Sequence, residues 1–481
     1  MLFNSFEFAV FFPLVAAAYF LLPHRWRWLL LLLASYGFYM AWRVEYAVLL
    51  LVSTLVDFTA ARGIAKARDP KGRRHWLWLS IAVNLGLLGT FKYFDFINGN
   101  LRALAAWGGM DWPVADLDMV LPMGISFYTF QTMSYTIDVY RGHMEPTRHL
   151  GRFALFVTFF PQLVAGPIER APNLLPQFLK RIGLDPTLVT SGLKLMLWGF
   201  VKKVVVADRV SLVVDHIYAQ PGEMDWTTLV LGGVLFGVQA YCDFSGYSDI
   251  AIGAARVLGI RLMRNFRTPY LSASIAEFWT RWHISLNAWF RDYVYIPLGG
   301  NRVTAGRWYF NLLVVFFISG LWHGAGWTYV LFGVLHGVYL VAAIHSRPFW
   351  VRFNAVSGLT HLPRFHHALR VAATFGLVTF SWFFFRAEDI GDTITIVERV
   401  STFAHGPLDT ASLFTAFKPG ILAVTLVLGF GLLLFDHRIE ELVHGTRPLS
   451  KAMDLLFHAT LLVLLVLFGN YGEVAFMYFQ F

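Results

Sequence analysis

The chain has 481 residues, of which 57% are hydrophobic and 14% are charged, against about 25% charged in soluble domains. This composition excludes a soluble globular protein and indicates a polytopic membrane protein. The net charge of +9 does not indicate a nucleic-acid partner, because the basic residues gather in short loops between apolar runs. The single cysteine, Cys242, excludes an internal disulfide.

Apolar runs recur along the chain, so we expect an all-α protein with roughly eleven transmembrane helices. The first run, 8–22, lacks a basic n-region and an A-x-A-type cleavage site, and we expect it to be retained. The later runs are 28–42, 46–56, 76–91, 119–137, 153–164, 192–206, 227–242, 308–345, 371–385, 421–435 and 455–470. Several are shorter than the roughly 17 residues that a span needs, which predicts re-entrant or buried helices. We expect residues 1–481 to form a single domain, since no linker or clear internal repeat is present.

The loops between the runs predict the orientation of the chain. Segment 61–75 carries six basic residues and one Asp, and residues 23–27 carry two Arg, so both are expected in the cytoplasm. The charged residues of segment 95–118 are four Asp and one Arg, so this segment is expected outside. The N-terminus is therefore expected to be extracytoplasmic.

Segment 256–307 has a different character from the apolar runs. It holds eight Arg against Glu277 and Asp292, interleaved with Trp and Tyr. At helical spacing four of its residues share one face, which predicts an interfacial helix with aromatic rings in the headgroup layer: Phe278, Trp282, Ser285 and Trp289. The arginines either anchor anionic lipids or hold the phosphates of a nucleotide-type donor.

The longest uncharged stretch, 308–346, contains His323. An imidazole in such a stretch either lines a polar path, does proton chemistry, or is a neutral side chain bonded to a neighbouring helix. His336 follows 13 residues later, which would be about 20 Å along one continuous helix. We expect it to be a second polar group of a tunnel or a satisfied core histidine.

Other polar residues in the apolar regions have simpler interpretations. Asp243 and Asp249 are expected to cap helices or to pair with Arg. Glu169 and Arg170 are expected to form a turn that fixes a re-entrant loop, or else only a local ion pair. No metal site is expected, because the chain has one Cys and no H-E-x-x-H sequence. The chain also lacks a phosphate-binding Gly-rich loop and a Gly-x-Ser-x-Gly elbow.

Five motifs occur in a fixed order along the chain. They are FPQLVAGPIER (160–170), DFSGYSD (243–249), EFWTRWHISL (277–286), DYVYIPLGG (292–300) and GLWHG (320–324). In this order they resemble the bacterial branch of the membrane-bound O-acyltransferase family, in particular its alginate O-acetylase type. The terminal sequences LFNS (2–5) and YFQF (478–481) resemble the same subgroup.

The resemblance implies a tunnel through the membrane and assigns roles to particular residues. It makes His323 the catalytic base and His283 the second polar residue of the site. Six further residues are expected to line the tunnel or bind substrate: Trp322, Trp282, Arg281, Asn287, Arg291 and His336. It also implies acetyl-CoA as a cytosolic donor with no bound cofactor, an exopolysaccharide acceptor such as alginate, an extracytoplasmic SGNH-type partner, and the lipids of a bacterial inner membrane.

The implied chemistry is physically coherent. Acyl transfer from a thioester to a hydroxyl requires the hydroxyl proton to leave, and a buried, neutral imidazole suits that task. His283 could orient the base or donate to the tetrahedral oxyanion. D-alanyl transfer to teichoic acid and acetylation of another glycan remain open. So does a proton-coupled transporter with His323 as a relay, although the sequence lacks inverted repeats and has few acidic groups inside the expected spans.

Overall fold

The computed structural model describes residues 1–443, 449–472 and 476–477, so the terminal motif 478–481 lies outside it. The described chain is helical, and its only β-type pairing is one isolated bridge between Met224 and Leu408. Eight of the described helices are long and apolar enough to cross a membrane, and α1 (Phe6–Leu21) is a shorter apolar helix. The expected all-α membrane architecture is therefore confirmed. Several of the roughly eleven expected spans are shorter elements. The run 153–164, for example, divides into α7 and α8.

The chain divides into two compact units. The first comprises residues 1–196 and 247–263, and the second comprises residues 197–246 and 264–477. Helices α10 (Pro186–Phe200) and α12 (Trp226–Val257) each contribute residues to both. The first unit otherwise contains α1, α2 (His24–Met40), α3 (Ala47–Lys66), α4 (Pro70–Leu88), η1 (Gly89–Tyr93), α5 (Phe94–Trp107), α6 (Ile125–Arg141), α7 (Leu150–Thr158), α8 (Phe160–Leu163), α9 (Ala171–Leu174) and η2 (Leu175–Leu179).

The second unit contains the remaining elements. They are η3 (Val201–Ala207), α11 (Asp208–Ala219), η4 (Pro269–Leu271), α13 (Ile275–Arg281), α14 (Ile284–Phe290), η5 (Arg291–Tyr295), α15 (Ala305–His323), α16 (Trp327–Val356), η6 (Leu359–His361), α17 (Pro363–Arg386), α18 (Ile390–Ser401), η7 (Thr410–Ser412), α19 (Leu413–Ala416), α20 (Pro419–Val443) and α21 (Lys451–Phe468).

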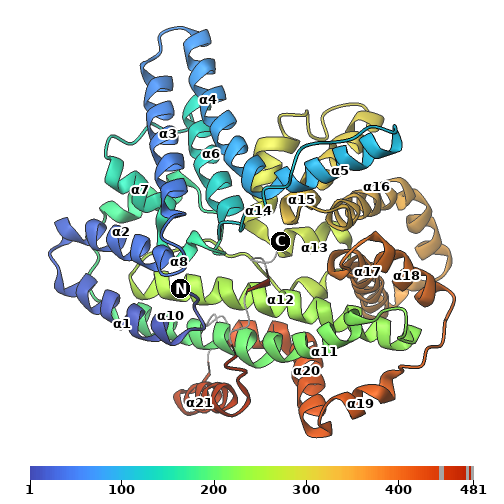
Figure 1. Cartoon of the computed structure of the whole chain (residues 1–481). Coiled ribbons are helices and arrows are strands. Elements are labelled where there is room, and N and C mark those ends of the chain that lie inside the picture. The colour runs from blue at the N-terminus through green and yellow to red at the C-terminus, as the bar shows by residue number, and fades with distance from the viewer. Residues whose placement is uncertain (444–448, 473–475, 478–481) are drawn as a thin grey trace. The chain divides into compact units, whose positions relative to one another are not determined.

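In the first unit, α3, α4 and α6 run side by side around a buried carboxylate (Figure 1). Asp57 on α3 accepts hydrogen bonds from Asn84 Nδ2 at 2.8 Å, from Thr136 Oγ1 at 2.9 Å and from the Ser80 hydroxyl. Since a buried carboxylate is costly unless it is hydrogen-bonded, this network explains how three helices tolerate one acid in their shared interior.

In the second unit, the uncharged stretch 308–346 forms two antiparallel helices and not one long one (Figure 1). Helix α15 ends at His323, and α16 begins at Trp327 after a short glycine-containing turn. Two glycines let the helix backbones touch, because a Cβ on Gly320 would lie 2.3 Å from the Tyr329 carbonyl and one on Gly333 would lie 2.2 Å from the Phe316 carbonyl.

The prediction of one interfacial helix within 256–307 is wrong. The segment breaks at Trp282 and His283 into two short helices, α13 and α14. All four residues of the predicted headgroup-facing stripe are buried in protein: Phe278, Trp282, Ser285 and Trp289. The reason is a left-handed backbone at His283 (φ 44°, ψ 55°), which ends one helix and starts the next in a new direction.

Candidate active site

His323 occupies the C-terminal end of α15, at the turn of the helical pair. It is 2% exposed and lies among aromatic rings, with ring centroids of Trp322, Phe332 and Phe385 at 5.1, 5.9 and 5.5 Å. The carbonyl end of a helix carries partial negative charge, which favours a cation placed there. An imidazolium at this position would therefore be stabilised by the helix terminus.

His283 is presented by the turn between α13 and α14. A neighbouring segment fixes this turn through backbone bonds: Arg267 N–H donates to the Arg281 carbonyl at 2.9 Å, and Ile284 N–H donates to the Asn265 carbonyl at 2.9 Å. The Asn265 side chain also accepts from Ser285 N–H at 3.2 Å. The position of His283 thus depends on residues about 18 positions upstream as well as on its own helices.

The structure brings the two histidines together around Trp322. The Trp322 ring lies 5.4 Å from the ring of His283 and 5.1 Å from that of His323, and Phe244 contacts His283 edge-on at 4.7 Å. Burial lowers the pKa of the His283 imidazole well below its usual range, and the charge that His323 would carry lowers it further. His283 is therefore neutral, so one of its ring nitrogens carries a proton and the other does not.

His336 has hydrogen-bond partners at both of its ring nitrogens. Trp279 Nε1, which can only donate, lies 3.2 Å from His336 Nδ1, so that nitrogen accepts and the proton sits on Nε2. Nε2 lies 2.9 Å from Ser381 Oγ, and that hydroxyl donates to the Val378 carbonyl at 2.7 Å. This arrangement matches a satisfied core histidine. The expected separation of about 20 Å along one helix does not apply, since the chain turns between His323 and His336.

Trp282 and Asn287 hold the scaffold of the site. Trp282 is 2% exposed, and its ring packs at 5.5 Å on Phe278 and 5.3 Å from Trp382. The Asn287 amide donates to the carbonyls of Trp279 and Trp282, both at 2.7 Å. Asn287 therefore ties the last turn of α13 to α14.

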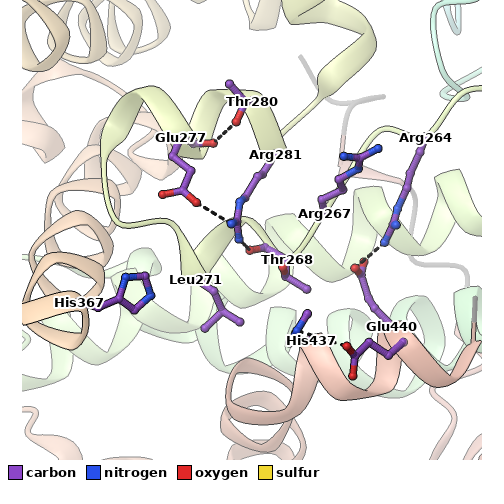
Figure 2. Close-up of a pocket in the computed structure, with 11 residues that line it drawn as sticks. Arg264, Arg267, Thr268, Leu271, Glu277, Thr280, Arg281, His367, His437 and Glu440 are labelled. Carbon is purple, nitrogen blue, oxygen red and sulfur yellow. Dashed lines mark hydrogen bonds and ion pairs between the residues drawn. The ribbon is translucent and has the colours of Figure 1, made fainter. Parts of the chain in front are cut away.

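An arginine-lined pocket of about 760 Å³ adjoins the segment that carries His283. Figure 2 shows Arg267 between Arg281 and Arg264, with α20 contributing His437 and Glu440 from the opposite side. Arg281 pairs with Glu277 at 2.5 Å, and Arg264 pairs with Glu440. Arg267 forms no ion pair with any carboxylate that the structure describes. The pocket thus has one uncommitted guanidinium and two that an anion could recruit from their carboxylates.

Apart from His336, the residues expected at the site fall into three places. His323, His283, Trp322 and Trp282 belong to one buried cluster. Arg281 lines the arginine pocket, whereas Asn287 and Arg291 line a separate apolar groove. Within the described ranges, no three His, Cys, Asp or Glu side chains are grouped to hold a metal ion.

Comparison with known proteins identifies the family. A model of the membrane-bound O-acyltransferase family matches residues 147–386, which include both histidines. A protein named "probable alginate O-acetylase AlgI" from Pseudomonas putida is 39% identical over 94% of this chain and 90% of its own length. The chain belongs to the membrane-bound O-acyltransferase family. It is accordingly a multi-pass membrane enzyme that transfers acyl groups to hydroxyl oxygen.

Two further relatives in this O-acyltransferase family differ in their printed activities. A peptidoglycan O-acetyltransferase from Helicobacter pylori is 34% identical over 83% of this chain and 79% of its own length. A teichoic acid D-alanyltransferase from Streptococcus thermophilus is 31% identical over 55% of this chain and 68% of its own length.

The sequence interpretation missed a buried ion triad close to the candidate site. Lys203, in the π-helix η3, contacts Asp208 at 2.7 Å and Asp243 at 2.6 Å, and all three are at most 3% exposed. Asp243 also accepts from Met477 N–H at 2.8 Å and directly precedes Phe244, whose ring contacts His283. A signal was present, because Lys203 lies inside the apolar run 192–206 and a lysine there needs a partner.

Glu169 also makes a tertiary contact that the sequence did not indicate. Its carboxylate accepts from Met263 N–H, so its hydrogen-bond partner lies far along the chain as well as in the adjacent Arg170. Burial raises the pKa of this carboxyl to about 7. Segment 166–169, which ends in Glu169, is therefore held by a tertiary contact within the first unit.

Proposed function

We propose that this O-acyltransferase moves an acetyl group from acetyl-CoA to a hydroxyl of an exopolysaccharide or of a partner that serves one, with His323 as general base. One observation carries the proposal: two buried histidines meet around Trp322 beside an arginine pocket. Arg281, which lines this pocket, is only two residues from His283 in the sequence.

The reaction assigns a separate task to each histidine. The acceptor oxygen attacks the thioester carbonyl carbon while His323 takes the hydroxyl proton, and the carbon–sulfur bond then breaks. The thiolate leaves and receives the proton from the imidazolium, which restores neutral His323. His283 donates a hydrogen bond to the oxyanion of the tetrahedral intermediate, which a neutral imidazole can do from its protonated nitrogen.

The arginine pocket supports a nucleotide thioester as donor. Phosphate oxygens accept from guanidinium groups in two-pronged contacts, so Arg267 offers a first anchor and Arg264 and Arg281 exchange their carboxylates for phosphate. Glu277 and Glu440 hold these two arginines in place when no donor is bound. The positive-inside pattern favours a cytoplasmic location for this face and an extracytoplasmic N-terminus.

The relatives support a polysaccharide acceptor. The alginate O-acetylase relative matches 94% of this chain, whereas the D-alanyltransferase relative matches 55%, which favours acetyl over D-alanyl transfer. We accordingly propose a bacterial inner-membrane location and an extracytoplasmic SGNH-type partner that places the acetyl group on the polymer. Alginate is the proposed polymer, and peptidoglycan is the alternative that the Helicobacter relative raises.

The test uses the full chain in proteoliposomes with radiolabelled acetyl-CoA outside and an alginate acceptor with the partner protein inside. His323→Ala is expected to reduce label transfer by roughly 10²- to 10⁴-fold, the usual contribution of a general base. His345→Ala is the matched control, because His345 is an exposed histidine on α16. Transfer that survives His323→Ala would remove the base from the proposal. Proton-coupled uptake without any label transfer by the native chain would favour the transporter.

A further inference from the structure

A second cavity, of about 670 Å³, lies between the α13–α14 segment and the α15–α16 pair. Its walls are mainly apolar and come from Leu312, Phe316, Leu340 and Ile344, with Trp279 on the side of α13. Ala343 on its edge is exposed, so the groove is open along the side of the helical pair. Both α15 and α16 are candidate membrane spans, and a groove that opens on their sides faces lipid.

The groove has one polar end and one apolar end. Trp308 in the first turn of α15 and Arg347 in the second half of α16 lie at the same end of the groove, because the two helices are antiparallel. Trp279 and Phe316 form the other end, where their rings are 5.3 Å apart. Trp308 and Phe316 are separated by eight residues, which is about 12 Å along the helix.

The polar end carries an excess of positive charge. Arg291 and Arg347 line it, and Asp292 pairs with Arg291 alone, at 2.8 Å. Arg347 forms no ion pair with any carboxylate in the part of the chain that the structure describes. Trp308 Nε1 donates to Tyr295 Oη at 2.9 Å, and such Trp–Tyr pairs are typical of the headgroup level of a bilayer.

We propose that this groove binds one anionic phospholipid, with its phosphate at Arg291 and Arg347 and one acyl chain along α15 and α16. The apolar wall matches the chain, and the net positive end matches a headgroup with uncompensated negative charge. A zwitterionic headgroup would place its own cation beside the two arginines and lose part of this attraction. The proposal does not depend on which donor or acceptor the enzyme uses.

The bound lipid would also support the neighbouring catalytic scaffold. Trp279 forms part of the groove wall, and it donates to His336 while its carbonyl accepts from Asn287. An acyl chain packed against the Trp279 ring would stabilise the α13–α14 turn that presents His283. Loss of the lipid is therefore expected to loosen the turn without removing a group that touches substrate.

The experiment measures lipid retention directly. The full chain is purified in mild detergent, titrated with phosphatidylglycerol or phosphatidylcholine, and examined by native mass spectrometry. Arg291→Gln/Arg347→Gln is expected to weaken phosphatidylglycerol binding about 25-fold, at about fivefold for each basic residue near an anionic headgroup, and to abolish the preference over phosphatidylcholine. Arg302→Gln is the matched control, since Arg302 is exposed and does not line the groove.

A second variant tests the apolar wall independently of charge. Ala343→Trp fills the groove from its exposed edge and is expected to reduce retention of both lipids while keeping both arginines. Thermal unfolding of each variant verifies that it is folded. Equal affinity of the native chain for the two lipids, or a double arginine variant that behaves like Arg302→Gln, would overturn the proposal.

Discussion

Replacing Gly333 by alanine tests whether the contact between α15 and α16 sets the catalytic geometry. The added Cβ would lie 2.2 Å from the Phe316 carbonyl and 2.9 Å from the Gly320 Cα, whereas real Cβ contacts are almost never below 3.0 Å. Both neighbouring atoms are backbone, so no side-chain rotation relieves the overlap. The two helices must separate by at least about 0.8 Å at this level.

The expected size of the effect follows from where this contact lies. Gly320 is one helical turn before His323, so a separation near Gly320 displaces the imidazole by a similar distance. A misplacement of about 1 Å costs on the order of 10²-fold in rate, and overpacking costs about 1–3 kcal/mol in stability. We therefore expect acetyl transfer to fall between 10- and 100-fold in a protein that still folds.

The assay compares initial rates of acetyl transfer and thermal unfolding in detergent for three proteins. Gly376→Ala is the matched control, because a Cβ at this position in α17 meets nothing within 4 Å. It should retain the native rate and gain slightly in stability, as alanine favours a helix over glycine. A Gly333→Ala protein with the native rate would refute the reasoning, since it would show that the helices can separate without moving the site.

Three further predictions concern buried charges, each measured by thermal unfolding. Glu169 ionises near pH 4.5 when unfolded but near pH 7 when folded, so its burial destabilises the protein progressively from pH 4.5 to pH 7. Glu169→Gln should therefore increase the free energy of unfolding more at pH 8 than at pH 5, by up to about 3 kcal/mol, and an equal gain at both would contradict this. Lys203→Met leaves two buried carboxylates facing each other and should cost about 3–5 kcal/mol, with partial recovery when Asp243→Asn is added; an unchanged melting temperature would exclude the triad as a stabilising element. Asp57→Leu removes the acceptor of three buried donors and should destabilise by at least about 1–3 kcal/mol, whereas Asp57→Asn, which keeps a carbonyl oxygen, should cost less.

The fold class could be predicted from the sequence because membrane helices leave a compositional signal that is local. Both histidines could also be predicted as site residues, since His323 lies in a long uncharged stretch and His283 lies in a recognisable motif. The sequence did not indicate that the chain turns between His323 and Trp327. Turn and continuous helix differ in which residues they bring into contact, and local composition does not report those contacts.

The features that could not be predicted from the sequence depend on contacts between residues distant in the chain. The spacing of aromatic residues within 275–290 fits one continuous helix, but Asn265 and Arg267 hold a break at its centre through backbone bonds. Likewise, Lys203 finds one of its carboxylates 40 positions away on α12. Pairings of this kind arise from tertiary structure, which helical periodicity does not encode.

The left-handed backbone at position 283 restricts which amino acids can evolve there before any chemistry is considered. Asparagine, aspartate, histidine and glycine adopt this conformation most readily, whereas a β-branched residue would have to rebuild the turn. Of these four, histidine and asparagine carry a neutral group that can donate a hydrogen bond at physiological pH. An ancestor or a laboratory variant could therefore exchange His283 for asparagine along a single low-cost route, while most other replacements would disturb conformation and reactivity together.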